Sequence, residues 1–249
     1  MTVARQWFGS IGFTLYLFLS VPVYGLLVYA TAPLPHRMTY RVVLGWVSSV
    51  LFMLRLLCRL DYVVEGREHL PAQNGVLLLK HSSAWETIAQ LKIFPTQTWV
   101  IKRELMWVPF LGWVLMLLKP IAINRRAGNS AVQQVLEQGE RHLQQGLWVA
   151  IFPEGTRVPA GESRRYGLSG ALLAAATGRP VVPVAHNAGD FWPRRGWLKK
   201  PGTVRVVIGP PIATAGREPR EINDQAQRWI EATVAQIRPG RVEPPSSRD

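Results

Sequence analysis

Two long apolar stretches with few charges occupy the N-terminal part of the chain. No Asp, Glu, Lys or Arg occurs between Arg5 and Arg37, and residues 7–32 are almost continuously apolar. A helix of this length can cross the ~30 Å hydrocarbon core of a bilayer. Pro22 would either kink a spanning helix or mark a segment that re-enters the same leaflet. A cleaved signal peptide is the alternative, but the apolar core is too long and Pro33 follows the supposed cleavage site.

The second stretch, residues 38–59, has a different pattern. It is too short to cross a bilayer, because only residues 42–54 lie between Arg41 and Arg55. At about 100° per residue its arginines fall on one narrow face, and apolar side chains cover the rest. This pattern predicts a helix lying in a membrane interface with its arginines toward the headgroups. A helix packed against its own protein is the alternative.

From Asp61 onward, short β-branched or leucine-rich runs alternate with amphipathic stretches. The runs predict strands at 62–64, 76–79, 98–101, 121–123, 148–152, 181–184 and 204–208. The stretches between them predict helices at 84–93, 129–145, 168–177 and 219–237. Such alternation is typical of an α/β fold, with a mixed, mostly parallel central sheet flanked by helices.

The chain of 249 residues is long enough for one such domain plus an appendage. We expect membrane-anchoring helices over residues 1–59, the α/β domain over 60–238 and a disordered tail over 239–249, which is rich in Pro, Ser and Arg. This places a membrane-associated helical segment before the sheet.

The hydrophobic content and the net charge of the chain limit the kinds of partner it can bind. The chain is 48% hydrophobic with ten Trp, so apolar surface must be covered, and its net charge of +13 indicates an anionic partner. Nucleic acid, anionic lipid and a phosphorylated substrate or acidic carrier all fit this charge, but no nucleic-acid-binding module is recognisable. A single cysteine excludes an internal disulfide and a cysteine-based zinc site. With no H-E-x-x-H, Walker or G-x-G-x-x-G motif, we expect neither a metal nor a nucleotide cofactor.

A histidine and a carboxylate follow the apolar run of residues 75–79. His81 and Glu86 are five positions apart, which on a regular helix leaves their side chains roughly 140° apart. They can meet only if His81 precedes a helix that Ser82 or Ser83 caps and Glu86 lies in its first turn. Such a pair can take a proton from a hydroxyl at neutral pH. The alternative is a capping box, in which Glu86 only reaches back to a backbone N–H.

Three further predicted strands also end in polar or basic groups. These groups are Lys102, Arg103, Asn124, Arg125, Glu154, Gly155, Thr156 and Arg157. Ligands of open α/β sheets bind outside the carboxyl ends of the strands, so groups from four strand ends can converge on one crevice. The crevice would be basic, and Arg can hold a phosphate through two parallel hydrogen bonds.

The order of these motifs resembles that of the 1-acyl-sn-glycerol-3-phosphate acyltransferase family, from about Gly75 to Ile212. The most specific element is Phe152-Pro-Glu-Gly-Thr-Arg157. The elements that agree in order are Lys102-Arg-Glu-Leu105, Asn124-Arg125, Val182-Pro-Val184 and Gly209-Pro-Pro-Ile212. The first motif of the family is a His followed by four residues and an Asp. This chain carries Glu86 at that place, which lengthens the side chain by one methylene and keeps its charge.

The resemblance implies an O-acyltransferase of phospholipid synthesis. An acyl group would pass from an acyl thioester, acyl-CoA or acyl carrier protein, to the sn-2 hydroxyl of 1-acyl-sn-glycerol-3-phosphate (lysophosphatidate), giving phosphatidate. His81 would be the general base and Glu86 would orient its ring. Lys102 and Arg157 would clamp the acceptor phosphate, and the other groups named above would belong to the same substrate site. No cofactor is implied beyond the thioester co-substrate.

The resemblance also implies a location and partners. These are a membrane lipid substrate, a thioester donor and an anionic membrane surface, with the catalytic domain facing the cytoplasm of a bacterial inner membrane. An apolar channel would select the acyl chain, and Trp107, Trp113 and residues 115–118 are candidates for its wall. The alternatives are another acceptor, such as a lyso-ornithine lipid, glycerol 3-phosphate or a lipid A precursor, and a non-catalytic membrane adaptor.

Overall fold

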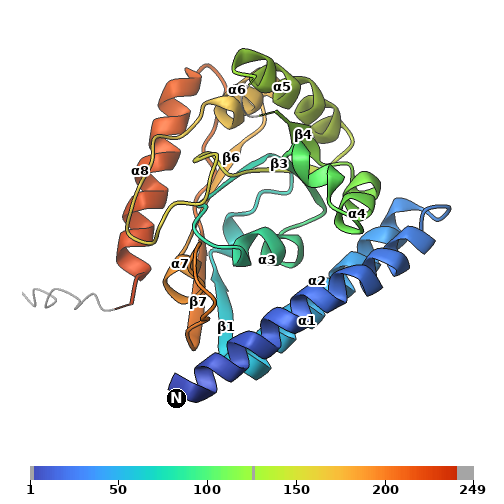
Figure 1. The fold of residues 1–249 in the computed structure, drawn as a ribbon. Coiled ribbons are helices and arrows are strands. Elements are labelled where there is room, and N and C mark those ends of the chain that lie inside the picture. The colour runs from blue at the N-terminus through green and yellow to red at the C-terminus, as the bar shows by residue number, and fades with distance from the viewer. Residues whose placement is uncertain (1–2, 125–126, 240–249) are drawn as a thin grey trace, which may run out of the picture.

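A seven-stranded sheet forms the centre of the computed structural model, which describes residues 3–124 and 127–239 (Figure 1). Its spatial order is β1-β7-β6-β2-β5-β3-β4. The strands are β1 (Leu60–Glu65), β2 (Val76–Leu79), β3 (Gln97–Lys102), β4 (Ile121–Ile123), β5 (Trp148–Ile151), β6 (Val181–His186) and β7 (Gly202–Ile208). All neighbours pair in parallel except β6 and β7, which are antiparallel. The predicted mixed, mostly parallel sheet is confirmed.

Helices cover both faces of the sheet, and strand β2 shows how. Because side chains alternate along a strand, Val76 and Leu78 face one way and Leu77 and Leu79 the other. The first pair belongs to an apolar core shared with α5 (Asn129–Gln144), α6 (Ser169–Thr177) and α8 (Pro219–Ile237). The second pair belongs to a core shared with α3 (Trp85–Ile93), α4 (Leu111–Leu118) and the two N-terminal helices. Burial on both faces explains why the central strands read as unbroken apolar runs.

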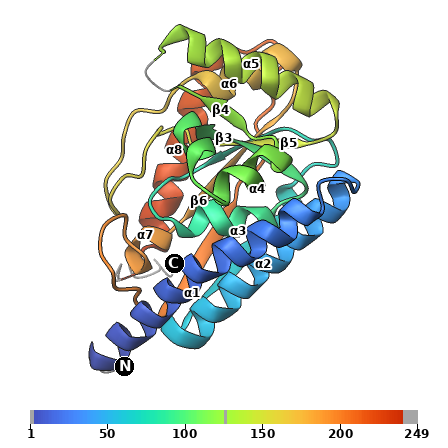
Figure 2. The ribbon, with the colours of Figure 1, turned by 45° about the vertical axis from the view of Figure 1, so that its right-hand side comes forward.

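The N-terminal helices α1 (Val3–Ala30) and α2 (His36–Cys58) form a hairpin that lies along one side of the domain (Figure 2). Both are long and apolar enough to cross a membrane, by length and composition. The prediction that the second stretch is too short to cross was therefore wrong: α2 begins at His36, and its few arginines leave the 23-residue helix apolar enough. They approach closely at Gly9, where an added Cβ would collide with the carbonyl oxygen of Leu57. Helix α1 continues through Pro22 without interruption. This apolar hairpin supports association with a membrane.

Helix α2 also packs against its own protein, which was the alternative for this segment. Val43, Val47, Val50 and Leu54 are buried in the core that contains Leu77. The placement of α2 in a membrane interface stays a prediction.

The remaining elements are short. They are the 3-10 turns η1 (Arg67–His69) and η2 (Arg103–Trp107) and the single-turn helix α7 (Ala188–Phe191). The pattern of the sequence predicted neither these turns nor α4. The predicted disordered tail lies outside the described residues, apart from Pro239.

Candidate active site

A cavity of about 570 Å³ opens at the carboxyl ends of β2, β5 and β3. Its polar end is lined by His81, Lys102, Thr156, Arg157 and Arg194. Its apolar part runs between the N-terminal hairpin, α3 and α4, and includes Leu17, Val21, Val28, Val43, Leu115 and Leu118. The cavity therefore joins a basic mouth to an apolar channel.

His81 lies between the end of β2 and the start of α3, and Glu86 lies in the first turn of that helix. The two side chains meet, with Glu86 Oε1 2.9 Å from His81 Nδ1. The ring stacks on Phe152 at 4.3 Å between centroids, and the side chain is only 9% exposed. Because Nδ1 is engaged by the carboxylate, Nε2 is the nitrogen left to meet a hydroxyl in the cavity. This is the geometry of a positioned general base.

Glu86 also holds the turn that precedes α3. Its Oε1 accepts hydrogen bonds from the backbone N–H groups of Ser82 and Ser83, at 2.9 and 2.8 Å. The capping interaction and the contact with the imidazole, which the sequence left as alternatives, therefore occur together on one oxygen. A carboxylate with three donors directs His81 and fixes the backbone beside it.

A second histidine, His186 at the end of β6, lies behind this pair. Its Nε2 donates to the carbonyl oxygen of Lys80 at 2.8 Å and is 3.9 Å from Glu86 Oε2, which has no hydrogen-bond partner among the described residues. Burial acts to raise the pKa of Glu86, yet the nearby His186, the His81 ring and the Ser83 N–H hold that pKa below its usual range. Burial lowers the pKa of His186. Glu86 is therefore ionised, and His186 is neutral, at neutral pH.

The turn after β5 fixes His81 from the other side. Gly155 has φ +67°, a left-handed conformation that glycine adopts without strain. Beyond it, the N–H of Val158 donates to the carbonyl oxygen of His81 at 2.8 Å. Glu154 Oε2 accepts the backbone N–H of His81 at 2.7 Å. The same turn thus carries Arg157 into the cavity and sets the position of His81.

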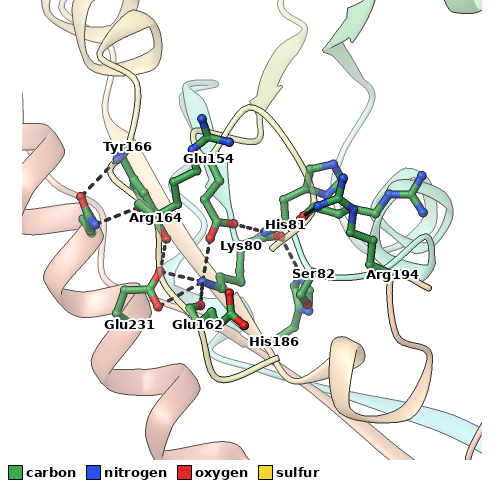
Figure 3. Close-up of polar contacts among 12 residues, drawn as sticks. Lys80, His81, Ser82, Glu154, Glu162, Arg164, Tyr166, His186, Arg194 and Glu231 are labelled. Atoms are coloured by element: carbon green, nitrogen blue, oxygen red, sulfur yellow. Dashed lines mark hydrogen bonds and ion pairs between the residues drawn. The ribbon is translucent and has the colours of Figure 1, made fainter. Parts of the chain in front are cut away.

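A buried ionic cluster lies behind the turn (Figure 3). Lys80 Nζ donates to Glu154 at 2.7 Å and to Glu231 of α8 at 2.8 Å, and its side chain is 2% exposed. Tyr166 donates its hydroxyl to Glu231 at 2.8 Å. Burial raises the pKa of Glu154, and Lys80 opposes that rise. The cluster links β2, the turn after β5 and α8.

The structure brings some of the expected substrate-site residues together. Lys102, Thr156 and Arg157 line the cavity. Arg103 begins η2 and is exposed, Asn124 follows β4, Gly155 is exposed, and Glu154 is buried with Lys80. Arg125 lies outside the described residues. Of the candidates for the channel wall, Leu115 and Leu118 line the cavity, whereas Trp107 is 82% exposed.

The sequence did not single out Lys80, His186, Arg194 or Glu231 as site residues. Lys80 and His186 each neighbour an expected motif, at the end of a predicted buried strand. The available signal for Lys80 was a charged residue directly after an apolar run. Glu231 and Arg194 follow no motif and are recognised only from their contacts.

Comparisons with known proteins all point to acyltransferases. A family model described as acyltransferase matches residues 61–187. A 1-acyl-sn-glycerol-3-phosphate acyltransferase from Pseudomonas aeruginosa is 45% identical over 232 residues, which cover 91% of this chain and 90% of that protein. The human 1-acyl-sn-glycerol-3-phosphate acyltransferase alpha is 29% identical over 168 residues, 66% of this chain and 59% of that protein.

The fold is also shared with a solved structure. The 1-acyl-sn-glycerophosphate (LPA) acyltransferase PlsC from Thermotoga maritima matches with a TM-score of 0.80 and 23% identity. The match covers 98% of this chain and 100% of that one. The shared fold includes the N-terminal helices as well as the sheet.

Proposed function

This chain belongs to the acyltransferase family, and we propose that it transfers an acyl group from a thioester donor to the sn-2 hydroxyl of 1-acyl-sn-glycerol-3-phosphate, giving phosphatidate. The observation that carries the proposal is the shared cavity: the His81 imidazole and the Arg157 guanidinium line it together, and an apolar channel continues from them. A lysophospholipid has a hydroxyl, a phosphate and an acyl chain, which match these three features.

His81 is the general base of the proposed reaction. Its Nε2 takes the proton of the sn-2 hydroxyl as that oxygen attacks the thioester carbonyl, and Glu86 stabilises the imidazolium that forms. The tetrahedral intermediate then expels the thiolate, which takes the proton from the imidazolium. The oxygen–acyl bond forms and the sulfur–acyl bond breaks, so no oxidant or cofactor is consumed. General base action contributes about 10²- to 10⁴-fold, so positioning of the two substrates must supply much of the remainder.

Lys102 and Arg157 clamp the phosphate of the acceptor. Arg157 follows the turn at Gly155, and Lys102 ends β3, two strands away from the strand that carries His81. The guanidinium can hold two phosphate oxygens in parallel, and the ammonium adds a point charge. Thr156, which also lines the cavity, borders the same phosphate. Clamping the phosphate fixes the distance from it to the attacking hydroxyl, so Arg157 selects a phosphorylated acceptor.

The membrane is the natural source of the acceptor. Helices α1 and α2 expose apolar side chains along much of their length, including Phe8, Phe18, Leu27, Phe52 and Leu56. An enzyme held by this surface takes a lysophospholipid from the leaflet without extracting its whole chain into water. Because acyl-CoA and acyl carrier protein are cytosolic donors, we place the catalytic domain on the cytoplasmic face of a bacterial inner membrane.

A direct assay tests the proposal. The purified protein is supplied with lysophosphatidate and either acyl-CoA or acyl carrier protein, and product masses are read by mass spectrometry. Phosphatidate should form, and His81→Ala should abolish it while leaving folding and vesicle binding intact. Preferential acylation of lyso-ornithine lipid, glycerol 3-phosphate or a lipid A precursor would replace the proposed acceptor. Turnover retained by His81→Ala would remove His81 from the mechanism.

Arg157→Ala gives a second, independent check of the acceptor site. It should raise the KM for lysophosphatidate about 10- to 100-fold, because a charge-assisted contact with the phosphate is lost. The KM for monoacylglycerol, which has no phosphate, should not change. An effect confined to the donor would show that Arg157 lies in a different subsite.

A further inference from the structure

A second cavity, of about 520 Å³, adjoins the active site on the side of α7. The cavity lining includes Gly189, Asp190, Arg194, Arg195, Lys200 and Arg238. We call this second cavity the basic groove. Arg194 lines both the basic groove and the cavity that contains His81, and it donates a hydrogen bond to the carbonyl oxygen of Arg157 at 2.8 Å. The two cavities are therefore neighbours that meet at one guanidinium.

The basic groove has an excess of positive charge. Asp190 is the acidic residue among those that line it, and its carboxylate is engaged by Arg238 at 2.9 Å. Within the described part of the chain, Arg194, Arg195 and Lys200 make no ion pair, and all three are exposed. Uncompensated cations in a concave site attract an anionic ligand.

The segment that bears these cations is held in place at both ends. Trp192 packs edge-on against Phe13 of α1 at 5.3 Å. The backbone N–H of Lys199 donates to Ser10 Oγ at 2.9 Å, and its ammonium lies over the rings of Phe13 and Trp192. Because both ends of the segment are fixed to α1, little ordering is needed when a ligand binds.

The basic groove is also close to the reacting atoms. Gly189 lies against Ser82, the residue after His81: a Cβ at Gly189 would come within 2.8 Å of Ser82 Oγ. Glycine at this position lets α7 approach the catalytic turn. The wall of the groove therefore lies beside the turn that carries His81.

We propose that this basic groove binds the phosphate of the thioester donor, the group carried by the phosphopantetheine arm of both coenzyme A and acyl carrier protein. The inference rests on the proposed function. In that reaction Lys102 and Arg157 hold the phosphate of the acceptor, so the phosphate of the donor needs a different site, from which its thioester can reach His81. Arg194 and Arg195 suit a phosphate because guanidinium groups bind its oxygens in pairs.

The test is a charge reversal at two residues that line only the groove, Arg195→Glu combined with Lys200→Glu. The KM for acyl-CoA should rise about tenfold or more, with kcat and the KM for lysophosphatidate unchanged. With acyl-pantetheine, a thioester donor that has no phosphate, wild type and variant should have the same KM. The matched control, Arg141→Glu with Arg220→Glu, reverses two exposed charges on α5 and on the first turn of α8, the end of that helix far from Arg238. The control should behave as wild type.

The two donors separate the sources of the phosphate. An equal rise in KM for acyl-CoA and for acyl carrier protein supports a site for the phosphate that the two donors share. A larger rise for acyl-CoA would mean that the groove also contacts the phosphates of its nucleotide. A loss with acyl carrier protein alone would overturn the proposal, because the cations would then dock an acidic protein surface. An unchanged KM for acyl-CoA, or an equal rise with acyl-pantetheine, would also overturn it.

Binding of coenzyme A alone, followed by calorimetry, reads the groove without turnover. The dissociation constant should rise about tenfold in the charge-reversal variant, and an unchanged constant would reject the groove. The binding measurement does not depend on turnover. If the wild-type protein makes no phosphatidate, the proposed function is rejected, but binding of coenzyme A in the groove can still be tested.

Discussion

Glu86 Oε1 accepts one hydrogen bond from the His81 ring and two from backbone N–H groups, so one oxygen shapes both the base and the turn that presents it. A substitution can keep the shape of this side chain and remove its charge, so the two contributions can be tested separately. An amide oxygen at the same place could still accept the backbone N–H groups, but it would not stabilise an imidazolium.

Glu86→Gln should therefore keep the fold and lower kcat by about 10²- to 10⁴-fold, the range of general base catalysis. Glu86→Asp is the matched variant, since it keeps the charge and shortens the side chain, and it should retain more activity than Glu86→Gln. Steady-state kinetics with thermal melting of each variant make the comparison. Activity near wild type in Glu86→Gln would limit Glu86 to its capping role.

His186 gives a prediction for stability against pH. Because burial lowers its pKa in the folded protein below the ordinary 6.5, the unfolded chain binds a proton at this residue before the folded protein does. The stabilisation is complete above pH 6.5 and is lost as pH falls through the lowered pKa. Glu86 acts in the same direction, but only below its ordinary value of 4.5.

The melting temperature in detergent micelles should therefore fall as pH decreases from 6.5 toward 5. His186→Gln keeps a donor for the Lys80 carbonyl without a titrating group, and it should flatten that slope. A slope that persists unchanged in the variant would assign the acid sensitivity to other groups.

Elements distant in sequence meet at the Lys80 cluster, where β2, the turn after β5 and α8 are tied by one ammonium. Lys80 and Glu231 are 151 positions apart, yet the Lys80 ammonium donates hydrogen bonds to both Glu231 and Glu154 Oε1. The second oxygen of Glu154, Oε2, accepts the backbone N–H of His81. The C-terminal helix therefore contributes to the placement of His81.

Lys80→Met should destabilise the protein by about 3–5 kcal/mol, because it leaves two carboxylates facing each other in a buried site. Glu231→Gln should cost less, about 1 kcal/mol, since Glu231 is partly exposed and Glu154 still pairs with Lys80. Denaturant unfolding monitored by circular dichroism would measure both. A larger loss for Glu231→Gln than for Lys80→Met would contradict this order.

Most elements could be predicted from the sequence because their patterns are local. The strand Val76–Leu79 and the helix Pro219–Ile237 have the bounds that their apolar patterns predict. Helix α4 was missed because Leu111–Leu118 is apolar on every side and shows no helical period. In the site, His81 and Glu86 are near neighbours in sequence, so their contact could be predicted. His186 and Glu231 act on Lys80 across 106 and 151 positions, and no local pattern encodes such contacts.

At the scale of the whole molecule, the two N-terminal apolar helices form part of the cavity that His81 lines. Phe13 of α1 and Val47 of α2 belong to the same core as Leu77 of the sheet, and Val21 and Val28 line the channel. The hairpin is therefore a wall of this cavity, and in the proposed function it is also the surface that faces lipid.

Filling this wall should change chain-length preference. Val21→Trp narrows the channel, so kcat/KM for long acyl chains relative to short ones should fall about tenfold or more. Val23→Trp is the control, because Val23 is exposed on the same helix and does not line the cavity. Competition assays with lysophosphatidates of mixed acyl chain length would give the ratio, and an equal effect of both variants would argue against a channel at Val21.

A channel bordered by lipid-facing helices has a practical consequence for handling the protein. A straight-chain surfactant with an anionic head has the same overall chemistry as the acceptor but lacks its hydroxyl. In the proposed function such a molecule would compete with the acceptor, because its tail would enter the channel lined by α1 and α4 and its head would pair with Arg157. Alkyl sulfates or phosphates used for solubilisation should inhibit competitively, whereas a bulky, rigid steroidal surfactant should not.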